Sequence, residues 1–490
     1  MGLFAGCYFD GCSVFGAKSL NALPDSRRLS ALLEIFGRRI RHLFCHVTAG
    51  TSTSRIGFCM SDCPSSIADL APQLPTHLPM GLRIRLSIMM VLQYGITGVW
   101  WVVLSIYLTR QLGFSGEQVG AVYGTMAVAS MVSPLVFGQI ADRWISTQYL
   151  LAFLHLAGAL MLYFLSQMTS FAPFYICVLL YAVLFIPTVS LTNSLTFHQI
   201  RDTSKHFPGV RVFGTIGWIL AGLFVGWTLD DTTSQPIMVA CLLSAVMGIY
   251  CLTLPDTPPS DQTSGAPPFV KAFAMLRDRM FLLFTVVSFI LSIAITSYFA
   301  FAAPFLKTID IETIAPVASI MAVGQFTEML LLPLLPFFLK HYGMKWTLVI
   351  GMGAWAVRYA IFCVGQPLAL VIVGVALHGV CCDFYFIAGY IYVDQQASRD
   401  MRASAQALYQ LVTAGLGMLL GNIIFGGIVD MSTREGVVAW PGVWGSAMIV
   451  VAVSVALFAV AFRGRRVATA PTPLPAVGLE DDANPDAPND

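Results

Sequence analysis

The sequence predicts an all-α polytopic membrane protein with twelve transmembrane helices arranged in two six-helix halves. Hydrophobic residues make up 57% of the 490 residues, charged residues only 11%, and the mean hydropathy is +0.75. Soluble proteins carry roughly 25% charged residues, so lipid must surround most of this chain. The apolar residues form windows of about the ~20 residues that a membrane-spanning helix needs, and the alternation typical of a transmembrane barrel is absent.

Twelve apolar windows follow Met80. Several are joined by very few residues, such as Gly365–Pro367, so consecutive helices should run antiparallel. The predicted spans are 86–109, 118–141, 147–168, 172–197, 211–229, 236–254, 280–303, 315–339, 345–363, 367–391, 403–430 and 440–462.

A polar connector at 255–279 separates the first six spans from the last six. Its Pro, Asp and Ser content is typical of a linker. The chain should therefore contain one six-helix bundle at 80–254 and a second at 280–463. Residues 1–79 hold no apolar run of the secretory-signal type. We expect 1–79 and the Pro- and Ala-rich tail 464–490 to be disordered extensions.

Lysine and arginine residues in the short loops predict the orientation. If the N-terminus is cytoplasmic, three basic residues lie on the outer side, namely Arg110, Lys307 and Arg434. Fifteen then lie on the cytoplasmic side: Arg83, Arg85, Arg143, Arg201, Lys205, Lys271, Arg277, Arg279, Lys340, Lys345, Arg399, Arg402, Arg463, Arg465 and Arg466. The positive-inside rule therefore places both termini in the cytoplasm.

Composition and motifs argue against several other classes of protein. The net charge is only +1, which indicates no nucleic-acid partner. We find no phosphate-binding lysine loop, no clustered nucleophile and base, and no cofactor motif, so neither ATP-driven transport nor an enzyme is supported. Cys45–His46 with Cys59 and Cys63 fits no common zinc spacing, and we expect no metal site.

A Gly-x-x-x-Asp-Arg motif, Gly138 to Arg143, lies between the second and third spans. Gly138 should let two helices approach closely. Asp142 can sit at the N-terminus of a neighbouring helix and be held there by the helix dipole. With Arg143, these residues predict a conformational latch that holds one conformer and releases in another.

Residues 80–463 resemble the nucleoside:proton symporter family of the major facilitator superfamily. The segments that carry the resemblance are Gly120–Tyr123, Ala141–Ser146, Pro187–Asn193, Arg211–Trp218, Gln325–Glu328, Cys382–Phe384 and Arg402–Gln406. The resemblance implies proton-coupled uptake of nucleosides across a bacterial-type inner membrane. It also implies alternating access around a site at the bilayer midplane. We expect a monomer surrounded by lipid.

Glu328 is the first candidate for a binding and proton-coupling residue. Ionisable groups inside apolar spans cost free energy on insertion and usually mark function. Glu328 lies in the middle of the eighth span, and Gln325 lies three residues earlier on the same helix face. A carboxyl group beside an amide can bind a polyol or a base edge and can also carry a proton. The alternative is a structural hydrogen bond to another helix.

The tenth span carries His378, Cys382 and Asp383. On an ideal helix His378 and Asp383 point about 140° apart, whereas His378 and Cys382 share a face. Asp383 is the second candidate for proton coupling. Its alternative is a buried ion pair with Arg358 of the ninth span, and His378 has a plain hydrogen-bonded structural role as its alternative.

Arg211, Thr215 and Trp218 form one stripe on the fifth span. A guanidinium, a hydroxyl and an indole on one face suit a ribosylated base. On spacing alone, such an arginine is more often an interfacial residue that reaches toward water than a ligand. The resemblance favours a binding role, because matching positions line the nucleoside site of the family.

This chain departs from the family at four candidate substrate-binding positions. The family has amide side chains where Thr296 and Phe299 stand here, and aromatic residues where His378 and Cys382 stand. The hydrogen-bonding groups of the site therefore differ. A proton-coupled nucleoside importer is our leading hypothesis, and a proton symporter for sugars or glycosides is the alternative. A non-transporting sensor with a transporter-like body is a third possibility, but it would need an effector domain.

Overall fold

This computed structural model describes residues 78–200, 202–259, 272–398 and 401–463. The predicted extensions therefore lie outside the described residues, except for Leu78 and Pro79. The same is true of 260–271, the middle of the predicted linker.

Helices account for nearly all of the described chain. In the N-terminal half they are α3 (Met80–Trp100), α4 (Leu104–Ile106), η3 (Tyr107–Gln111), α5 (Gly116–Arg143), α6 (Thr147–Gln167), α7 (Phe171–Gln199), α8 (Thr203–Thr228) and α9 (Gln235–Cys251). The C-terminal half contains η4 (Phe273–Arg277), α11 (Arg279–Thr308), η5 (Ile311–Thr313), α12 (Val317–Leu331), η6 (Leu332–Leu334), α13 (Leu335–His341), α14 (Gly343–Val364), α15 (Leu368–Ala376), α16 (His378–Cys381), η7 (Cys382–Ile387), α17 (Ala388–Gln396), α18 (Arg402–Gln410), η8 (Leu411–Gly417), α19 (Met418–Met431), β1 (Thr433–Arg434), β2 (Val437–Val438) and α20 (Trp440–Ala461).

Within the described residues, eleven helical segments are long and apolar enough to cross a membrane. The predicted span 236–254 corresponds to α9, which is apolar but has only 17 residues. The all-α expectation needs one correction, because β1 and β2 form a short antiparallel hairpin. Glu435 and Gly436 both have positive φ between these strands, which is typical of a tight two-residue hairpin turn.

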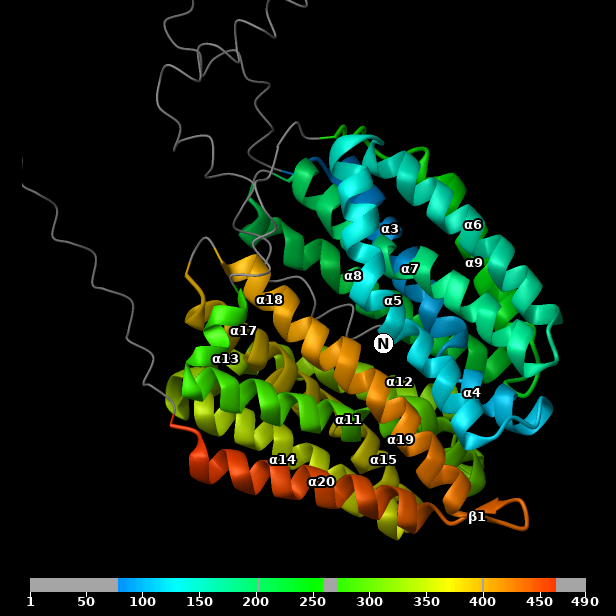
Figure 1. Ribbon diagram of the computed structural model, residues 1–490. Coiled ribbons are helices and arrows are strands. Elements are labelled where there is room, and N and C mark those ends of the chain that lie inside the picture. Colours follow the sequence, from blue (N-terminus) through cyan, green and yellow to red (C-terminus); the bar gives the residue numbers. More distant parts are fainter. Residues whose placement is uncertain (1–77, 201, 260–271, 399–400, 464–490) are drawn as a thin grey trace, which may run out of the picture.

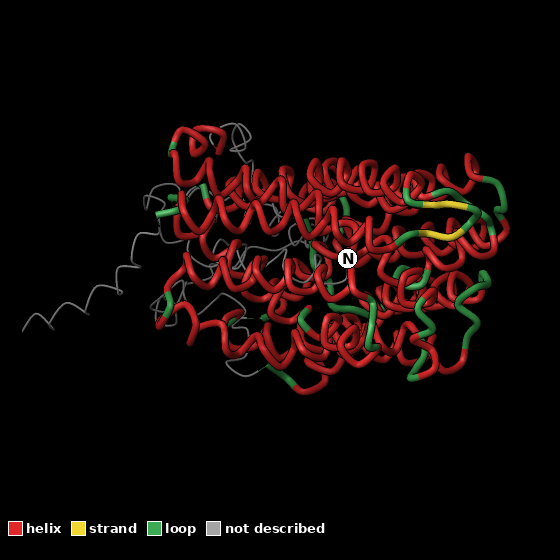
Figure 2. Tube along the Cα trace, turned by 90° about the horizontal axis from the view of Figure 1, so that it is seen from below, coloured by secondary structure: helices red, strands yellow, loops and turns green. Residues whose placement is uncertain are grey.

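The helices form two groups that lie side by side (Figure 1). The helices up to α9 pack mainly on one another, and so do the helices from α11 onward. Seen from below, the long helices run roughly along one direction, with the β1–β2 hairpin at one end of the molecule (Figure 2). We name this end the hairpin end. The opposite end, where α9 ends and α11 begins, is the linker end.

Local sequence signals mark where several helices begin. Ser115 and Gln118 form a capping box at the start of α5, with both reciprocal hydrogen bonds present. Asp278 accepts hydrogen bonds from the amides of Met280 and Phe281 and so caps α11. Each cap satisfies N–H groups that would otherwise be free at the first turn and so fixes where the helix begins. α5 and α11 begin within three residues of the predicted spans.

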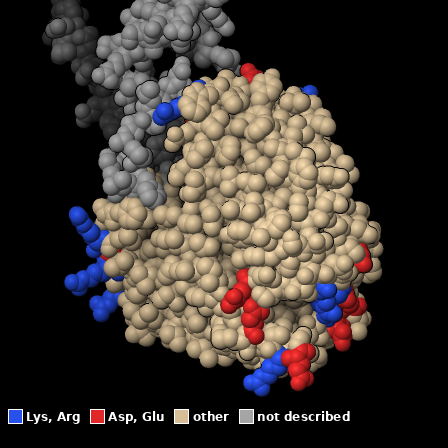
Figure 3. Space-filling view, turned by 45° about the vertical axis from the view of Figure 1, so that its right-hand side comes forward, with Lys and Arg blue, Asp and Glu red and all other residues tan. Residues whose placement is uncertain are grey.

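The surface between the two ends is almost free of charge. In the space-filling view, Lys, Arg, Asp and Glu gather toward the ends and leave a broad uncharged area between them (Figure 3). Large apolar side chains are exposed on the outer helices, for example Leu135 at 62% and Val460 at 84%. Such a surface suits contact with lipid rather than water.

The two halves meet closely at the hairpin end. A Cβ atom on Gly116 would lie 2.5 Å from the carbonyl oxygen of Gly426, so only glycine allows α5 and α19 to approach there. The amides of Gly116 and Glu117 donate to the Asp430 carboxylate at 2.5 and 2.8 Å. A carboxylate of one half therefore caps a helix of the other half, where the helix dipole favours it.

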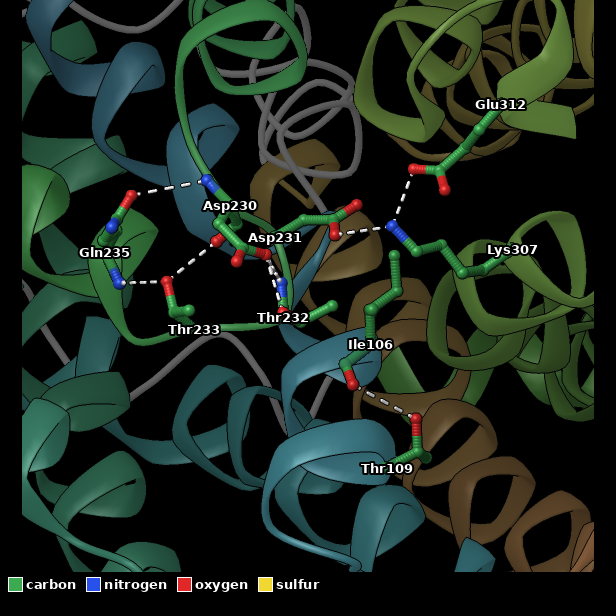
Figure 4. A network of polar contacts seen from close by, with 9 residues as sticks. All are labelled: Ile106, Thr109, Asp230, Asp231, Thr232, Thr233, Gln235, Lys307 and Glu312. Atoms are coloured by element: carbon green, nitrogen blue, oxygen red, sulfur yellow. Dashed lines mark hydrogen bonds and ion pairs between the residues drawn. The ribbon is translucent and has the colours of Figure 1, made fainter. Parts of the chain in front are cut away.

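An ion pair also joins the halves at this end (Figure 4). Lys307 of α11 lies between Asp231, 2.8 Å away in the α8–α9 loop, and Glu312, 2.6 Å away. In the same loop, hydrogen bonds from the Thr232 hydroxyl and amide hold the pKa of Asp230 below its usual range. We call the Asp430 cap and the Lys307–Asp231 pair the hairpin-end clamp.

The predicted latch at the linker end makes no contacts like those of the hairpin-end clamp. A Cβ atom on Gly138 would meet nothing within 4 Å, so Gly138 makes no close helix contact in this conformer. Asp142 and Arg143 are exposed. Among the described residues Asp142 forms no ion pair within 4.0 Å, although it acts electrostatically on His198 and Arg143. The carboxylate that caps a helix across the halves is Asp430, at the other end.

Candidate functional site

The candidate residues of the C-terminal half meet because two helices approach unusually closely. A Cβ atom on Gly379 would lie 2.6–2.7 Å from the backbone of Thr327 and Glu328, and one on Gly324 would lie 2.9 Å from the Cβ of His378. Two facing glycines therefore let α12 pack backbone against backbone on α16. This contact places Glu328 of α12 opposite the side chains of His378 and Cys382 in the tenth span.

Glu328, His378 and Cys382 form one cluster. One donor atom from each residue lies within 4.8 Å of the others, and all three side chains are buried. The Cys382 thiol lies 3.4 Å from Nε2 of His378, which confirms that these two residues share a helix face. The tenth span is not one ideal helix, however. The span is interrupted at Leu377 and contains a π-helical segment, η7.

Arg358 was the alternative partner predicted for Asp383, but it contacts other groups in the structure. Its Nε donates to the carbonyl oxygen of Gly374 at 2.9 Å, and its Nη1 lies 3.3 Å from Nδ1 of His378. The carbonyl groups at the end of α15 are available because the helix is interrupted, and they suit a cation. Because a guanidinium can only donate, Nδ1 of His378 must accept, and Nε2 carries the hydrogen of the neutral ring.

Aromatic rings complete the environment of Arg358 and His378. The guanidinium lies over the rings of Tyr298 and Trp355, 4.3 and 4.5 Å from their centroids. The ring of Tyr298 also stacks on His378, with a centroid distance of 5.3 Å. Phe299, one of the predicted binding residues, contacts His378 edge-on at 6.2 Å. Cation–π contacts of this kind stabilise a buried cation that has no carboxylate partner.

Two carboxyl groups in this region have unpartnered oxygens. Both carboxyl oxygens of Asp383 lack a hydrogen-bond partner in the described part of the chain, and so does Oε2 of Glu328. Asp383 is fully buried, and Glu328 is 8% exposed. The two carboxyl groups also act electrostatically on each other. Buried polar atoms are nearly always paired in proteins, so unpartnered carboxyl oxygens indicate a functional site.

The predicted stripe of the N-terminal half lies at the same level of the bundle. The antiparallel helices α8 and α12 are in close contact at Gly222 and Ala318. A Cβ atom on Gly222 would lie only 3.3 Å from the carbonyl oxygen of Ala318. Thr215 lies seven residues before Gly222 on α8, and Gln325 lies seven residues after Ala318 on α12. Because the helices are antiparallel, Thr215 and Gln325 lie at the same height in the bundle. Arg211, one turn further, acts electrostatically on Glu328 across the halves.

The Arg211 side chain contacts an aromatic ring of a neighbouring helix. Its guanidinium lies 4.0 Å from the centroid of the Tyr94 ring of α3, and its side chain is half-buried. Trp218 is 6% exposed, and its Cα lies 3.1 Å from the position of a Cβ atom on Gly98. The buried Thr296 hydroxyl donates to the carbonyl oxygen of Ser292 on its own helix. The remaining predicted residue, Gln325, is 8% exposed.

Tyr94, Tyr298 and Trp355 were not predicted from the sequence, although each ring contacts a guanidinium group of the site, Arg211 or Arg358. Aromatic residues are common in apolar helices, and no local pattern distinguishes these three. The metal-ligand geometry of Glu328, His378 and Cys382 was also not expected. The four-residue spacing of His378 and Cys382 was its one local signal.

Comparison with known proteins shows the family of this chain. The model of the nucleoside H⁺ symporter family matches residues 80–466. This chain belongs to the nucleoside H⁺ symporter family. The match covers both halves and every residue of the site described above, and it leaves out most of the two predicted extensions.

Several members of known sequence or structure are similar to this chain. YegT of Escherichia coli strain K12 is 36% identical over 402 residues, which cover 77% of this chain and 93% of YegT. The xanthosine permease of the same strain is 30% identical over 384 residues, covering 74% and 92%. The crystal structure of the nucleoside transporter NupG has a TM-score of 0.73 at 29% identity, covering 79% of this chain and all of NupG. The symporter family and these neighbours are transporters, not enzymes.

Proposed function

We propose that this protein is a proton-coupled nucleoside importer of a bacterial inner membrane. Its membership of the nucleoside H⁺ symporter family carries this proposal, together with similarity to proteins named as nucleoside and xanthosine permeases. In this proposal α9 serves as the sixth of twelve spans. Both termini lie in the cytoplasm, following the distribution of lysine and arginine. The protein acts as a monomer within lipid.

The substrate site lies between the halves in this proposal, with Arg211, Thr215 and Trp218 on one side. The other side is formed by Thr296, Phe299, Gln325, Glu328, His378, Cys382 and Asp383. The unpartnered oxygen of Glu328 supports this arrangement. It can accept a hydrogen bond from a ribose hydroxyl or a base, and it can bind a proton. Glu328 and Asp383 are the proposed proton-coupling groups, because Arg211 and Arg358 stay charged.

The clamp supports an alternating-access cycle. With both termini in the cytoplasm, the hairpin end faces outward, and this structure is a conformer closed on the outside. Transport then requires the Asp430 and Lys307 contacts to open on the outer side. We propose that Asp142 engages a neighbouring helix in the opposite conformer, since it is exposed here and caps no helix of the other half among the described residues.

Uptake into vesicles tests the proposed function. Vesicles containing the full chain receive labelled uridine, adenosine or lactose, with and without an imposed pH gradient that is acidic outside. We expect gradient-dependent accumulation of a nucleoside and none of lactose. Accumulation of lactose that uridine and adenosine do not compete with would replace the nucleoside proposal by a glycoside symporter. Nucleoside uptake that ignores the gradient would refute proton coupling.

A further inference from the structure

Glu328, His378 and Cys382 present a carboxylate oxygen, an imidazole nitrogen and a sulfur atom to one point. The three donor atoms lie within 4.8 Å of one another, and they come from two helices that two facing glycines hold in contact. From this geometry we infer that the cluster is a binding site for a thiophilic divalent metal ion such as Zn²⁺. This inference goes beyond the proposed transport of nucleosides and does not depend on it.

The donor set and spacing fit zinc. Zinc is bound by Cys, His and carboxylate ligands about 2.0–2.3 Å from the ion, in tetrahedral geometry. Ligand atoms around such an ion lie roughly 3.5 Å apart, so the donors need to close by up to about 1.3 Å. His378 and Cys382 are four residues apart, which presents both on one face of the helix. A water molecule can take the fourth position.

Unpartnered oxygen atoms point to a missing ligand. Oε2 of Glu328, whose residue is 92% buried, and both oxygens of Asp383 have no hydrogen-bond partner in the described part of the chain. A bound cation would satisfy the Glu328 oxygen directly and would attract Asp383 as an outer-shell group. The three potential negative charges of Glu328, Asp383 and the Cys382 thiolate would balance a divalent ion together with Arg358.

Binding requires protons to move in a defined way. The Cys382 thiol loses its proton to solvent and becomes the thiolate that coordinates the ion. The hydrogen on Nε2 of His378 also leaves, and Nδ1 takes up a hydrogen so that the ring stays neutral. Arg358 then gives up its 3.3 Å contact with Nδ1 and keeps the carbonyl oxygens of Gly374 and Val375.

Such a site would have consequences for transport. An ion bound to Glu328 competes with both proton and substrate for the same carboxylate, so Zn²⁺ should inhibit. It would also fasten α12 to α16 and η7 within the C-terminal half. The family resemblance implies aromatic residues at the positions of His378 and Cys382 in other members, so the site is expected to be particular to this chain.

Cobalt and zinc titrations of the purified full-length protein test the site. Co²⁺ bound to a thiolate gives a charge-transfer absorption band, which zinc removes when it displaces cobalt. We expect one such band, whose intensity falls sharply in Cys382→Ser and persists in Cys381→Ala. Cys381 is the matched control because it is an equally buried neighbouring cysteine that is not part of the cluster. His378→Phe should weaken zinc affinity at least about tenfold.

The result is independent of any transport assay. A band of equal strength in Cys382→Ser and in the unchanged protein would overturn the proposal, because the metal would then be bound elsewhere. Equal loss in Cys381→Ala would overturn it as well. If Cys382→Ser does not fold, Glu328→Gln provides the second test, since it keeps the shape of the side chain and weakens metal binding. Unchanged zinc affinity in Glu328→Gln would exclude Glu328 as a ligand.

Discussion

The two halves each contain a buried histidine, but the polar groups around the two histidines differ. In the N-terminal half His155 lies 2.9 Å from the amide oxygen of Gln93, and the Gln93 amide donates to Thr188 at 2.8 Å. The hydroxyl of Ser244 donates to the His155 carbonyl oxygen at 2.8 Å. This network joins α3, α6, α7 and α9, and each of its hydrogen-bonding side chains has a partner.

The cluster around His378 is incompletely paired by contrast. His378 contacts Arg358 and Cys382, while the nearby carboxyl groups of Glu328 and Asp383 have unpartnered oxygens. A satisfied network rigidifies a helix bundle, and unsatisfied buried carboxyl groups cost free energy that a ligand can recover. The comparison therefore indicates a structural role for His155 and a ligand-binding role for the His378 cluster.

The largest expected effect is that of Glu328→Gln. This change keeps the shape and one acceptor but removes the ability to ionise, so gradient-driven accumulation should be abolished while substrate binding remains measurable. The measurement is uptake against a concentration gradient under an imposed pH step, at saturating substrate. Glu435→Gln, in the exposed hairpin turn, is the control and should accumulate normally. Normal accumulation by Glu328→Gln would move the proton role to Asp383 or His378.

A second change tests the structural role of His155. His155→Leu leaves the buried Gln93 oxygen without its donor, which should lower the free energy of unfolding by about 1–3 kcal/mol. Thermal unfolding in detergent should show the loss, whereas the affinity for nucleoside should stay unchanged. His341→Leu, at an exposed histidine, should change neither quantity. A loss of affinity without loss of stability would assign His155 to the binding site and remove the contrast between the halves.

A third pair of changes compares the two ends of the molecule. Asp430→Asn weakens two charge-assisted hydrogen bonds to the start of α5, so hydrogen exchange of the Gly116 and Glu117 amides should increase. Asp142→Asn should leave that exchange unchanged and should slow turnover more than it weakens binding. Mass spectrometry of peptides covering the start of α5 measures the first effect. If Asp142→Asn lowered affinity at a normal exchange rate between conformers, the latch hypothesis would be wrong.

The smallest effect is expected for deletion of residues 1–79. No pattern in this segment indicates packing against a span, so uptake by the shortened protein should equal that of the full chain. The comparison requires equal amounts of inserted protein, measured by quantitative blotting of the membranes. Complete loss of uptake at equal insertion would show that the segment contributes to transport.

Local patterns in the sequence determined much of this molecule. Apolar windows alone predicted the membrane helices, because a helix must satisfy its own backbone in lipid and needs a defined length to cross it. The shared face of His378 and Cys382 followed from helical spacing, which depends only on residues four positions apart. Likewise, Glu328 could be identified as unusual because a carboxyl group in an apolar span is costly wherever the helix packs.

Contacts between distant segments were decided by the tertiary structure. Arg358 could have paired with Asp383 by charge alone, but it contacts carbonyl oxygens at the interrupted end of α15 and the rings of Tyr298 and Trp355 instead. The carboxylate that caps α5 comes from Asp430, 314 residues further along the chain, and not from the motif at Asp142. The partner of a buried charge depends on which helix faces approach, and that is set by packing at glycines such as Gly116, Gly324 and Gly379. No local sequence pattern contains this information.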